Sequence, residues 1–576
     1  MPVICGPVNG TVRISRDADG VELMVIELDA TPGEDQSYVE WFEPLVGIST
    51  VWTPTGDIDK SLDYEWDHGR TSRNVDGAPV FSFVGPDDCN RLTVAVDETL
   101  HPVRIRHGVR EEDGTAHIRI YPPATSLVLR VDRRPLPLAQ ALAQVTGWWD
   151  QTRRHPILPV PPVAHRGFYS TWYSLHQDFD EATLREECRH AAALGLAGII
   201  IDDGWQTEDA SRGYATCGDW QVHPSKIADM AAFVAFAHEL NLRVLLWFSV
   251  PFVGHDSQAY SRLKPFALRS TTDHAWEQHD RGWIVVDPRC PEARNHVVES
   301  VVQAVVAWDL DGLKLDFVDE FFRDAHSPPY DPTTMDVATV EEGANALLFT
   351  LRERVATVRE DTLIEFRQRY VGPQMRAYGN VFRANDCPNN ALINRVRTID
   401  LRLLSGTTAI HSDMIMWNRE DSYDSAALQF VAVLFAAPQI SVRLAALPPE
   451  HQEMVRWWLS VFQRYRAVLQ HTPLVVAGVD SHYSRVEGAT DDIRFVCLYG
   501  ERLAEIRGDD AARQEVVLVN GADARRIAVC AAESQLAWFG RIHDAAGRAV
   551  GTARVDATGT VAVKVPMAGM VVFRRE

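Results

Sequence analysis

The sequence predicts a multidomain protein with a central (β/α)₈ TIM barrel, an N-terminal β-sandwich and a small C-terminal β-sandwich. Its 576 residues are too many for one hydrophobic core. The spacing of apolar residues also changes twice, from short alternating segments to strand–helix repeats and back. We therefore expect a β-sandwich over residues 1–133, a proline-rich linker with a short helix over 134–165, the barrel over 166–471 and the second β-sandwich over 472–576.

Both terminal parts show the period-two pattern of half-buried strands. VELMVIELDA and NRLTVAVDE near the N-terminus, and EVVLVNG and TVAVKV near the C-terminus, alternate apolar and polar residues between Gly-, Asp- and Pro-containing breaks. That pattern is typical of antiparallel β-sandwiches. Between the N-terminal part and the central part of the chain lie the segments RRPLPLAQ and HPILPVPPVAHRG, which are rich in proline and indicate a linker.

The central part alternates strand and helix patterns, such as RVLLWFSV and EATLREECRHAAALG. Eight strands over roughly 300 residues is the count of a (β/α)₈ barrel, whereas doubly wound sheets, the rival architecture, usually hold fewer. The predicted strands cover residues 167–174, 197–205, 243–250, 312–320, 363–370, 381–386, 408–417 and 439–444.

The amino-acid composition limits the kinds of binding partner that we expect for this protein. The formal net charge is −22, so a nucleic-acid or anionic-membrane partner, which needs a basic surface, is not expected. We find no secretory signal and no bilayer-spanning apolar run. The 8 cysteines are scattered without zinc-like spacing, which favours a reduced, cytoplasmic protein without a structural metal. A homo-oligomer is compatible with the sequence.

The segment DGLKLDFVDE (311–320) carries unusual polarity for a buried strand. Strands of α/β proteins are normally aliphatic on both faces, yet Lys314 and Asp316 lie two residues apart and hence on one face. Because active sites of (β/α)₈ barrels lie at the carboxyl ends of the strands, we collected the polar and aromatic residues there. They are Trp172, Tyr173, Asp202, Asp203, Trp205, Trp247, Lys314, Asp316, Asp319, Glu320, Arg367, Arg369, Asp386, His411 and Asp413.

Acids, arginines and indoles from at least six strands thus converge on one end of the barrel. This mixture suits a sugar, because aromatic faces pack on pyranose C–H surfaces while carboxylates and arginines hydrogen-bond hydroxyls. Each residue alone has a structural explanation. A single Asp at a strand end is more often a helix N-cap, as we expect for Asp319, Glu320 and the Asp180–Glu181 pair, and a strand Trp usually packs in a core.

Two carboxylates stand out, Asp316 on the fourth strand and Asp386 at the end of the sixth. A retaining glycosidase needs one carboxylate as nucleophile and another as acid/base. Lys314 is expected to keep Asp316 ionised by lowering its pKa. The neutral surroundings of Asp386 in RANDCPNN are expected to raise its pKa and keep it protonated.

Five motifs carry a resemblance to a known family: IIIDDGWQ (199–206), GDWQVHPSKI (218–227), LLWF (245–248), VVDPRCPEAR (285–294) and DGLKLDF (311–317). At these motifs the sequence resembles the melibiase-type α-galactosidases of glycoside hydrolase clan D. The resemblance implies a retaining enzyme that acts on terminal α-linked sugars of small oligosaccharides and needs no metal or other cofactor.

By the same resemblance Asp316 is the nucleophile and Asp386 the acid/base. Asp202 and Asp203 are expected to bind the sugar's 4- and 6-hydroxyls, with Trp247 and Lys314 as further contacts. Trp172, Trp205, Arg367, Arg369, His411 and Asp413 complete the predicted substrate-binding set.

The sequence also departs from the family. Val318 stands where the family usually has a hydroxyl-binding Asn, and EFRQRYVGP replaces a Cys- and Gly-rich stretch after the fifth strand. The arginines Arg367 and Arg369 in that segment suggest an anionic or modified sugar as an alternative to galactose.

Further alternatives are a transglycosylase with the same machinery, a silent sugar-binding barrel and a metal-dependent lyase or isomerase. In the last, Asp202, Asp316 and Glu365 would bind a divalent cation and Lys314 would act as a base.

Overall fold

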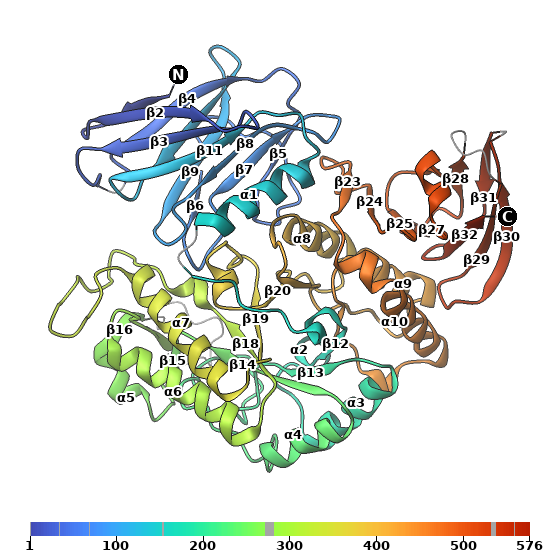
Figure 1. The fold of residues 1–576 in the computed structure, drawn as a ribbon. Helices are drawn as coiled ribbons and strands as arrows, with labels where there is room; N and C mark the ends of the chain where they lie inside the picture. Colours follow the sequence, from blue (N-terminus) through green and yellow to red (C-terminus); the bar gives the residue numbers. More distant parts are fainter. Residues whose placement is uncertain are drawn as a thin grey trace.

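The computed structural model describes residues 2–33, 35–67, 69–152, 155–270, 282–531, 537–557 and 559–575. Figure 1 shows a central barrel with one group of β-sheets above it and a second group to its side, formed by the N- and C-terminal parts of the chain. The predicted fold class is therefore confirmed. The domain boundaries proposed from the sequence stay a prediction.

The N-terminal part forms two packed antiparallel sheets with strand orders β1-β4-β10-β9-β6 and β2-β3-β11-β8-β7-β5. Alternate apolar residues of both sheets, among them Ile26, Trp41 and Phe83, face each other in a buried core, as in other β-sandwiches. The strands are β1 (Val3–Cys5), β2 (Gly10–Arg16), β3 (Glu22–Leu28), β4 (Tyr38–Pro44), β5 (Thr50–Trp52), β6 (Arg70–Ser72), β7 (Val80–Val84), β8 (Asn90–Val96), β9 (Val103–Arg110), β10 (Thr115–Tyr121) and β11 (Ser126–Asp132).

All eight barrel strands lie within the predicted segments. They pair in parallel in the order β21-β20-β19-β18-β14-β13-β12-β22, and parallel bridges Ile415–Ile440 and His411–Ala437 connect the two ends of this sheet. The strands are β12 (Phe168–Ser170), β13 (Gly198–Ile201), β14 (Arg243–Ser249), β18 (Gly312–Asp316), β19 (Leu363–Arg367), β20 (Val381–Arg383), β21 (Ala409–His411) and β22 (Gln439–Ile440).

Alternate residues of these strands fill the barrel interior in layers, as strand geometry requires. The lowest layer is apolar and contains Phe168, Ile200, Leu245, Leu363, Val381 and Ala409. Two residues further along their strands lie polar groups in register, since Lys314 pairs with Glu365 and Arg383 with His411. The charged face of β18 therefore points into the barrel, which explains its departure from the aliphatic pattern.

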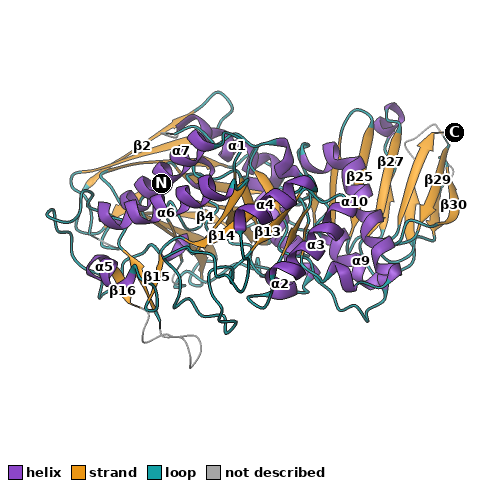
Figure 2. Ribbon diagram, turned by 90° about the horizontal axis from the view of Figure 1, so that it is seen from below, coloured by secondary structure: helices purple, strands orange, loops and turns teal. Residues whose placement is uncertain are grey.

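Helices cover most of the outer surface of the barrel (Figures 1 and 2). Several begin at capping residues visible in the sequence: Asp180 accepts a hydrogen bond from Thr183 N, and Thr339 with Glu342 forms a capping box. The helices are α1 (Leu138–Thr152), α2 (Trp172–Leu175), α3 (Glu181–Ala193), α4 (Met230–Glu239), α5 (Tyr260–Leu263), α6 (Pro291–Trp308), α7 (Val340–Val358), α8 (Ala391–Leu404), α9 (Tyr423–Ala432) and α10 (Pro449–Gln470).

Short elements complete the barrel part. A side sheet of order β15-β17-β16 precedes α6. These elements are β15 (Phe252–Gly254), β16 (Ala267–Ser270), β17 (Trp283–Val286) and the 3₁₀ turns η1 (Pro162–His165), η2 (Lys264–Phe266), η4 (Val318–Glu320), η5 (Met375–Ala377) and η6 (Leu444–Ala446). No helix among the described residues is both long enough and apolar enough to cross a membrane.

The connection between β19 and β20 is irregular, because residues 368–380 contain only the turn η5 where a barrel helix is expected. Helix α1, which was predicted as part of a linker, packs against the neighbouring α8. Its residue Thr146 donates to Leu404 O at 3.0 Å, and Asp150 accepts from Arg376 of η5 at 2.7 Å. The linker helix therefore covers the barrel beside this gap.

The C-terminal part forms a seven-stranded sheet (β23-β24-β25-β27-β32-β29-β30) and a three-stranded sheet (β26-β28-β31). Both contribute to one apolar core that includes Val529 and Phe573. The elements are β23 (Val475–Ala477), β24 (Arg485–Ala489), β25 (Ile493–Leu498), β26 (Leu503–Glu505), η7 (Gly508–Ala512), β27 (Glu515–Asn520), β28 (Ile527–Cys530), β29 (Trp538–His543), β30 (Ala549–Val555), β31 (Thr560–Val563) and β32 (Met570–Arg575).

Asp400 on α8 joins all three parts of the chain. Its buried carboxylate accepts hydrogen bonds from Trp52 Nε1 (2.8 Å) and Lys60 Nζ (2.9 Å) of the N-terminal sandwich and contacts the Tyr483 hydroxyl of the C-terminal part. A buried carboxylate is costly unless it is fully paired. The barrel therefore depends on its N-terminal neighbour at this point.

Candidate active site

The carboxyl ends of four adjacent strands bring their side chains together at one end of the barrel, which we call the mouth. Asp202 directly follows β13, Trp247 lies in β14, Asp316 ends β18 and Arg367 ends β19. These strands are neighbours in the order β19-β18-β14-β13. The sequence prediction that these four residues share one end of the barrel agrees with this arrangement.

Asp316 is the most strongly held carboxylate of the mouth. Its Oδ1 accepts hydrogen bonds from Arg367 Nε (2.7 Å), Tyr370 Oη (2.6 Å) and Phe317 N (2.8 Å), and its Oδ2 accepts one from Trp247 Nε1 (3.1 Å). Phe317 has a φ of +61°, which is uncommon for an aromatic residue and turns the chain sharply after the strand.

These partners keep Asp316 ionised. Burial alone would raise the pKa of Asp316, but the charges of Arg367 and Lys314, with the Tyr370 and Trp247 hydrogen bonds, hold this pKa well below the usual range. The expected effect of Lys314 is thus present. However, Arg367 has the larger effect, and the ammonium of Lys314 contacts Asp202 directly.

Asp386 lies in the loop after β20, and its side chain is 46% exposed. The expectation of a raised pKa is wrong. Burial acts in that direction, but the guanidinium of Arg383, whose Nη2 donates to Asp386 Oδ1 at 2.9 Å, and then Arg367 and Lys314 lower the pKa of Asp386. This pair is not evident from the sequence, because the side chain of Arg383 belongs to the barrel interior whereas Asp386 follows three residues later in the loop.

Asp413 shares Arg383 with Asp386. Its Oδ1 accepts from Arg383 Nη1 (2.6 Å), and its Oδ2 accepts from Tyr173 Oη (2.9 Å) and Cys387 N (2.6 Å). Burial raises the pKa of Asp413 to about 6, and the charge of Asp386 adds to this effect. The bond to Cys387 N anchors the loop that carries Asp386, so Asp413 supports the mouth from below.

The pair Asp202–Asp203 is buried. Asp202 contacts Lys314, and its backbone N donates to Thr171 Oγ1 (2.9 Å). The carboxylate of Asp203 accepts from Gln206 Nε2 (2.7 Å) and Gln177 Nε2 (2.8 Å), and burial raises the pKa of Asp203 to about 7. Both carboxylates therefore already have protein partners.

The predicted tryptophans separate into two groups. Trp205 is fully buried, donates to Trp247 O (3.0 Å) and packs against Trp220 and Phe248, so its assignment as a substrate contact is corrected to core packing. Trp172 on α2 is partly exposed. The indole of Trp247 contacts the candidate nucleophile.

Two further predicted contacts lie away from the mouth. His411 is completely buried, donates from Nε2 to Ala164 O (2.8 Å) and accepts at Nδ1 from Gln439 Nε2 (3.0 Å). Burial lowers the pKa of His411 to about 4, so this histidine is neutral and packs inside the protein. Arg369 extends toward the N-terminal sandwich, where its Nη2 donates to Asp76 Oδ2 at 3.2 Å.

The N-cap interpretation of Asp319 and Glu320 is also wrong. Both lie in η4, where Glu320 accepts from Arg269 Nη2 (2.5 Å). Asp319 has a buried Oδ1 without a hydrogen-bond partner among the described residues. Burial raises the pKa of Asp319 to about 6.

The alternative metal site is not formed. In the described part of the chain, no three His, Cys, Asp or Glu side chains are grouped so that they could hold a metal ion. Asp202 contacts Lys314, Asp316 pairs with Arg367, and Glu365 accepts from Gln439 Nε2 (2.5 Å), so each proposed ligand has a different partner.

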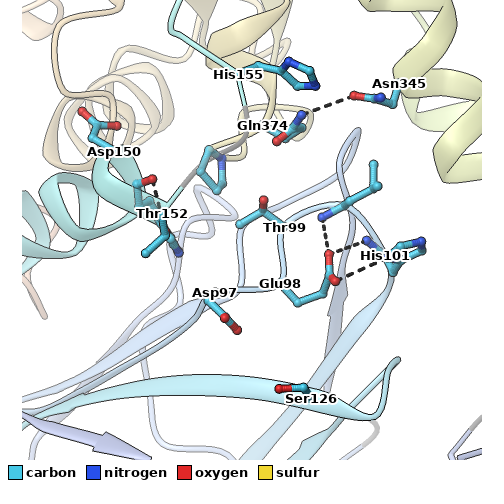
Figure 3. Close-up of a pocket in the computed structure, with 13 residues that line it drawn as sticks. Asp97, Glu98, Thr99, His101, Ser126, Asp150, Thr152, His155, Asn345 and Gln374 are labelled. Atoms are coloured by element: carbon cyan, nitrogen blue, oxygen red, sulfur yellow. Dashed lines mark hydrogen bonds and ion pairs between the residues drawn. The ribbon is translucent and has the colours of Figure 1, made fainter. Parts of the chain in front are cut away.

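A polar pocket of about 290 Å³ lies away from these residues, where the β8–β9 loop, α1 and the barrel meet (Figure 3). Glu98 accepts from His101 N (3.0 Å), and Gln374 Nε2 donates to Asn345 Oδ1 (3.3 Å). The pocket contains none of the residues predicted for the site. We therefore do not assign it to the active site.

The fold and the residues of the mouth together define a (β/α)₈-barrel protein. The mouth holds two candidate catalytic carboxylates, the buried and ionised Asp316 at the end of β18 and Asp386 in the loop after β20. The predicted resemblance to the melibiase-type α-galactosidases is confirmed, since residues 163–353 match the family model described as Melibiase. Alpha-galactosidase 1 of Pediococcus pentosaceus is 24% identical over 200 residues, which are 34% of this chain and 26% of that protein. The matched segment thus spans about a quarter of the relative's length.

Solved structures share the whole fold. The α-galactosidase from Lactobacillus brevis has a TM-score of 0.63 at 14% identity and covers 100% of this chain and 85% of that chain. A variant of α-galactosidase AgaA from Geobacillus stearothermophilus, in complex with raffinose, has a TM-score of 0.61 at 14% identity and covers 100% and 87%. At this identity the likeness establishes the fold.

Proposed function

We propose that this chain is a retaining, exo-acting α-glycosidase, and specifically an α-galactosidase, with Asp316 as nucleophile and Asp386 as acid/base. The observation that carries the proposal is that four hydrogen-bond donors surround Asp316 at the mouth of the barrel and keep its buried carboxylate ionised. The Melibiase match over residues 163–353 and the relatives named α-galactosidases support the choice of reaction and sugar.

The reaction is a double displacement. A carboxylate oxygen of Asp316 attacks the anomeric carbon, the bond from that carbon to the glycosidic oxygen breaks, and Asp386 gives its proton to the departing oxygen. Water then attacks the anomeric carbon, Asp386 takes the proton, and Asp316 leaves as a carboxylate. A sugar hydroxyl in place of water would make the same chain a transglycosylase.

Asp386 must be protonated in the first step, although Arg383 lowers its pKa in the free protein. Two features favour protonation once a sugar is bound. The negative charge of Asp316 already opposes ionisation of Asp386, and a sugar that covers its half-exposed carboxylate removes stabilising water. Substrate binding is therefore expected to raise the pKa of Asp386.

The arrangement of the arginines favours a neutral sugar. The suggestion of an anionic sugar rested on Arg367 and Arg369 being free in the mouth. Arg367 instead pairs with Asp316 at 2.7 Å and Arg369 with Asp76 at 3.2 Å. A substrate carboxylate would have to compete with these pairs, so galactose is the better candidate.

A stereochemical measurement tests the proposal. p-Nitrophenyl α-galactoside is hydrolysed in the NMR tube, and α-galactose is expected to form before the β-anomer. The variant Asp316→Ala should lose turnover but yield β-galactosyl azide when azide is supplied. A control is Asp361→Ala, which removes a surface carboxylate before β19 and should behave as the wild type. First formation of β-galactose, or full activity of Asp316→Ala, would overturn the assignment.

A further inference from the structure

Two buried polar atoms face each other inside the barrel without forming a hydrogen bond. Arg383 Nε and Glu365 Oε1 lie 3.7 Å apart, which is beyond hydrogen-bond distance. Both residues are almost completely buried, and neither atom has a hydrogen-bond partner among the described residues. An unsatisfied buried polar group is costly. An unused donor opposite an unused acceptor therefore indicates a contact that closes in another state of the site.

The other nitrogens of the Arg383 guanidinium are engaged on the side of the mouth. Nη1 donates to Asp413 Oδ1 (2.6 Å) and Ala384 O (2.9 Å), and Nη2 donates to Asp386 Oδ1 (2.9 Å). Asp413 is completely buried, whereas Asp386 is half-exposed and belongs to a loop. The contact with Asp386 is therefore the one that Arg383 can give up most easily.

Glu365 has only neutral hydrogen-bond partners among the described residues. Its Oε2 accepts from Gln439 Nε2 at 2.5 Å. His411 Nδ1 lies 3.6 Å from the same oxygen, but this histidine is neutral, and its Nδ1 accepts from Gln439 instead of donating to Glu365. A carboxylate at Glu365 thus has no imidazolium to neutralise it.

The charged groups that face Glu365 come from three strands: Lys314 from β18, Arg383 from β20 and Asp202 from the end of β13. Burial raises the pKa of Glu365 to about 7. The charges of Arg383 and then Lys314 oppose this rise, and that of Asp202 adds to it. The ammonium of Lys314 already contacts Asp202. A closer approach of Arg383 would therefore stabilise the ionised form of Glu365.

Asp386 and Glu365 compete for the same cation. The charged and titratable groups that face Asp386 are Arg383, Arg367, Lys314, Asp316, Asp413 and Tyr173. Among the cations, Arg383 has the largest effect on the pKa of Asp386 and also on that of Glu365. A guanidinium that moves toward one of these carboxylates weakens its hold on the other.

We propose that Glu365 is a positioning residue for the acid step: it receives Arg383 Nε while Asp386 carries its proton. The inference rests on the proposed function. Once Asp386 is protonated, Nη2 no longer faces an anion, and the guanidinium closes the gap of 3.7 Å to Glu365. After Asp386 has given its proton to the glycosidic oxygen, its new negative charge draws Arg383 back. An acid that lies beside an arginine can be protonated in this way.

The competing explanation is that Glu365 only supports the packing of the barrel interior. The two explanations differ in which substrates are affected. A residue that acts through the acid changes reactions whose leaving group needs a proton, whereas a purely structural residue changes the turnover of every substrate alike.

The test measures kcat/KM against pH for an α-galactosyl disaccharide, whose leaving group needs a proton, and for α-galactosyl fluoride, whose leaving group does not. In the full-length, isosteric variant Glu365→Gln, Arg383 has no second anion to move to and stays with Asp386. The pKa of Asp386 should then fall, and the basic limb for the disaccharide should move to lower pH by about one unit, as for a strengthened charged contact.

Above that limb, kcat/KM of Glu365→Gln for the disaccharide should be about tenfold below the wild type, since one pH unit corresponds to a tenfold change in the protonated fraction. The value for the fluoride should stay within about twofold. Glu299→Gln is the control, because it neutralises a half-exposed carboxylate that pairs with Arg354 on the outer surface, and it should leave both profiles unchanged.

A second variant separates contact from charge. Glu365→Asp keeps the negative charge, but its shorter side chain cannot reach Arg383 Nε, so the basic limb for the disaccharide should again move to lower pH. A wild-type limb in Glu365→Asp or in Glu365→Gln, or equal losses on both substrates, would overturn the positioning role. Failure of the wild type to turn over the fluoride would contradict the proposed function itself and is distinguishable from these outcomes.

Discussion

Replacement of Arg367 by glutamine is expected to shift the acidic limb of the pH–rate profile. The guanidinium donates to Asp316 Oδ1 at 2.7 Å, and its charge is the largest influence that lowers the pKa of Asp316. Tyr370, Trp247 and Lys314 remain in the variant. The carboxylate therefore stays in place but loses its main counter-charge.

The size of the shift follows from the bond that is lost. A hydrogen bond between charged partners contributes about 1.5–3 kcal/mol, and one pKa unit corresponds to about 1.4 kcal/mol. Arg367→Gln should therefore raise the pKa of Asp316 by about one to two units. In the proposed mechanism only the ionised carboxylate attacks. We therefore expect kcat/KM to fall as the pH drops through this pKa, and the acidic limb of the variant should lie at correspondingly higher pH.

The assay is kcat/KM for p-nitrophenyl α-galactoside as a function of pH, with the limb taken from the fit. Arg367→Lys keeps the charge and should show a smaller shift. Arg262→Gln, at an exposed pair with Glu292, should show none. An unchanged limb in Arg367→Gln would refute the conclusion that Arg367 controls the ionisation of Asp316.

Three other predictions concern the acid and the domain junction. Asp386→Ala should retain far more activity on aryl galactosides with good leaving groups than on disaccharides, because such leaving groups need no proton; equal losses would contradict the acid role. Asp413→Asn removes a negative charge beside Asp386, so the pKa of Asp386 should fall and the basic limb of kcat/KM for disaccharides should move to lower pH. Lys60→Met leaves the buried Asp400 without its cation, which should cost about 3–5 kcal/mol of unfolding free energy in guanidinium titrations. That cost should shrink as the pH falls, because Asp400, whose pKa is already raised by burial, then takes up a proton.

The strands and the inward-facing residues could be predicted because they follow local rules. Each barrel strand is a short aliphatic run bounded by loop residues, and alternation then places Lys314 with Asp316 on the inner face. The helix that is missing between β19 and β20 could not be predicted in this way. The segment QRYVGPQMRAYG contains turn-forming residues, but the covering of this gap by α1 depends on contacts over more than 200 residues of sequence.

Two predictions about the site are wrong, the neutral surroundings of Asp386 and the substrate contact of His411. Both depend on the length and direction of side chains, which the sequence pattern does not give. Arg383 lies on the inner face of β20, and its long side chain reaches the loop residue Asp386, so the loop is not neutral. His411 ends β21, but its imidazole is completely buried and hydrogen-bonds Ala164 O and Gln439 inside the protein, so it does not reach the mouth.

Arg367 links the surroundings of the two candidate catalytic carboxylates. Its Nε donates to Asp316, the proposed nucleophile, and its Nη1 donates to Asn385 Oδ1 at 3.1 Å, next to Asp386, the proposed acid. One rigid guanidinium thus contacts Asp316 and the residue that precedes Asp386. The following Gln368 accepts from Asn385 N and lies against Gly56 of the sandwich. Arg367 and Gln368 therefore connect Asp316, the loop of Asp386 and the N-terminal sandwich, so under the proposed mechanism substitutions of these two residues should change the turnover rate.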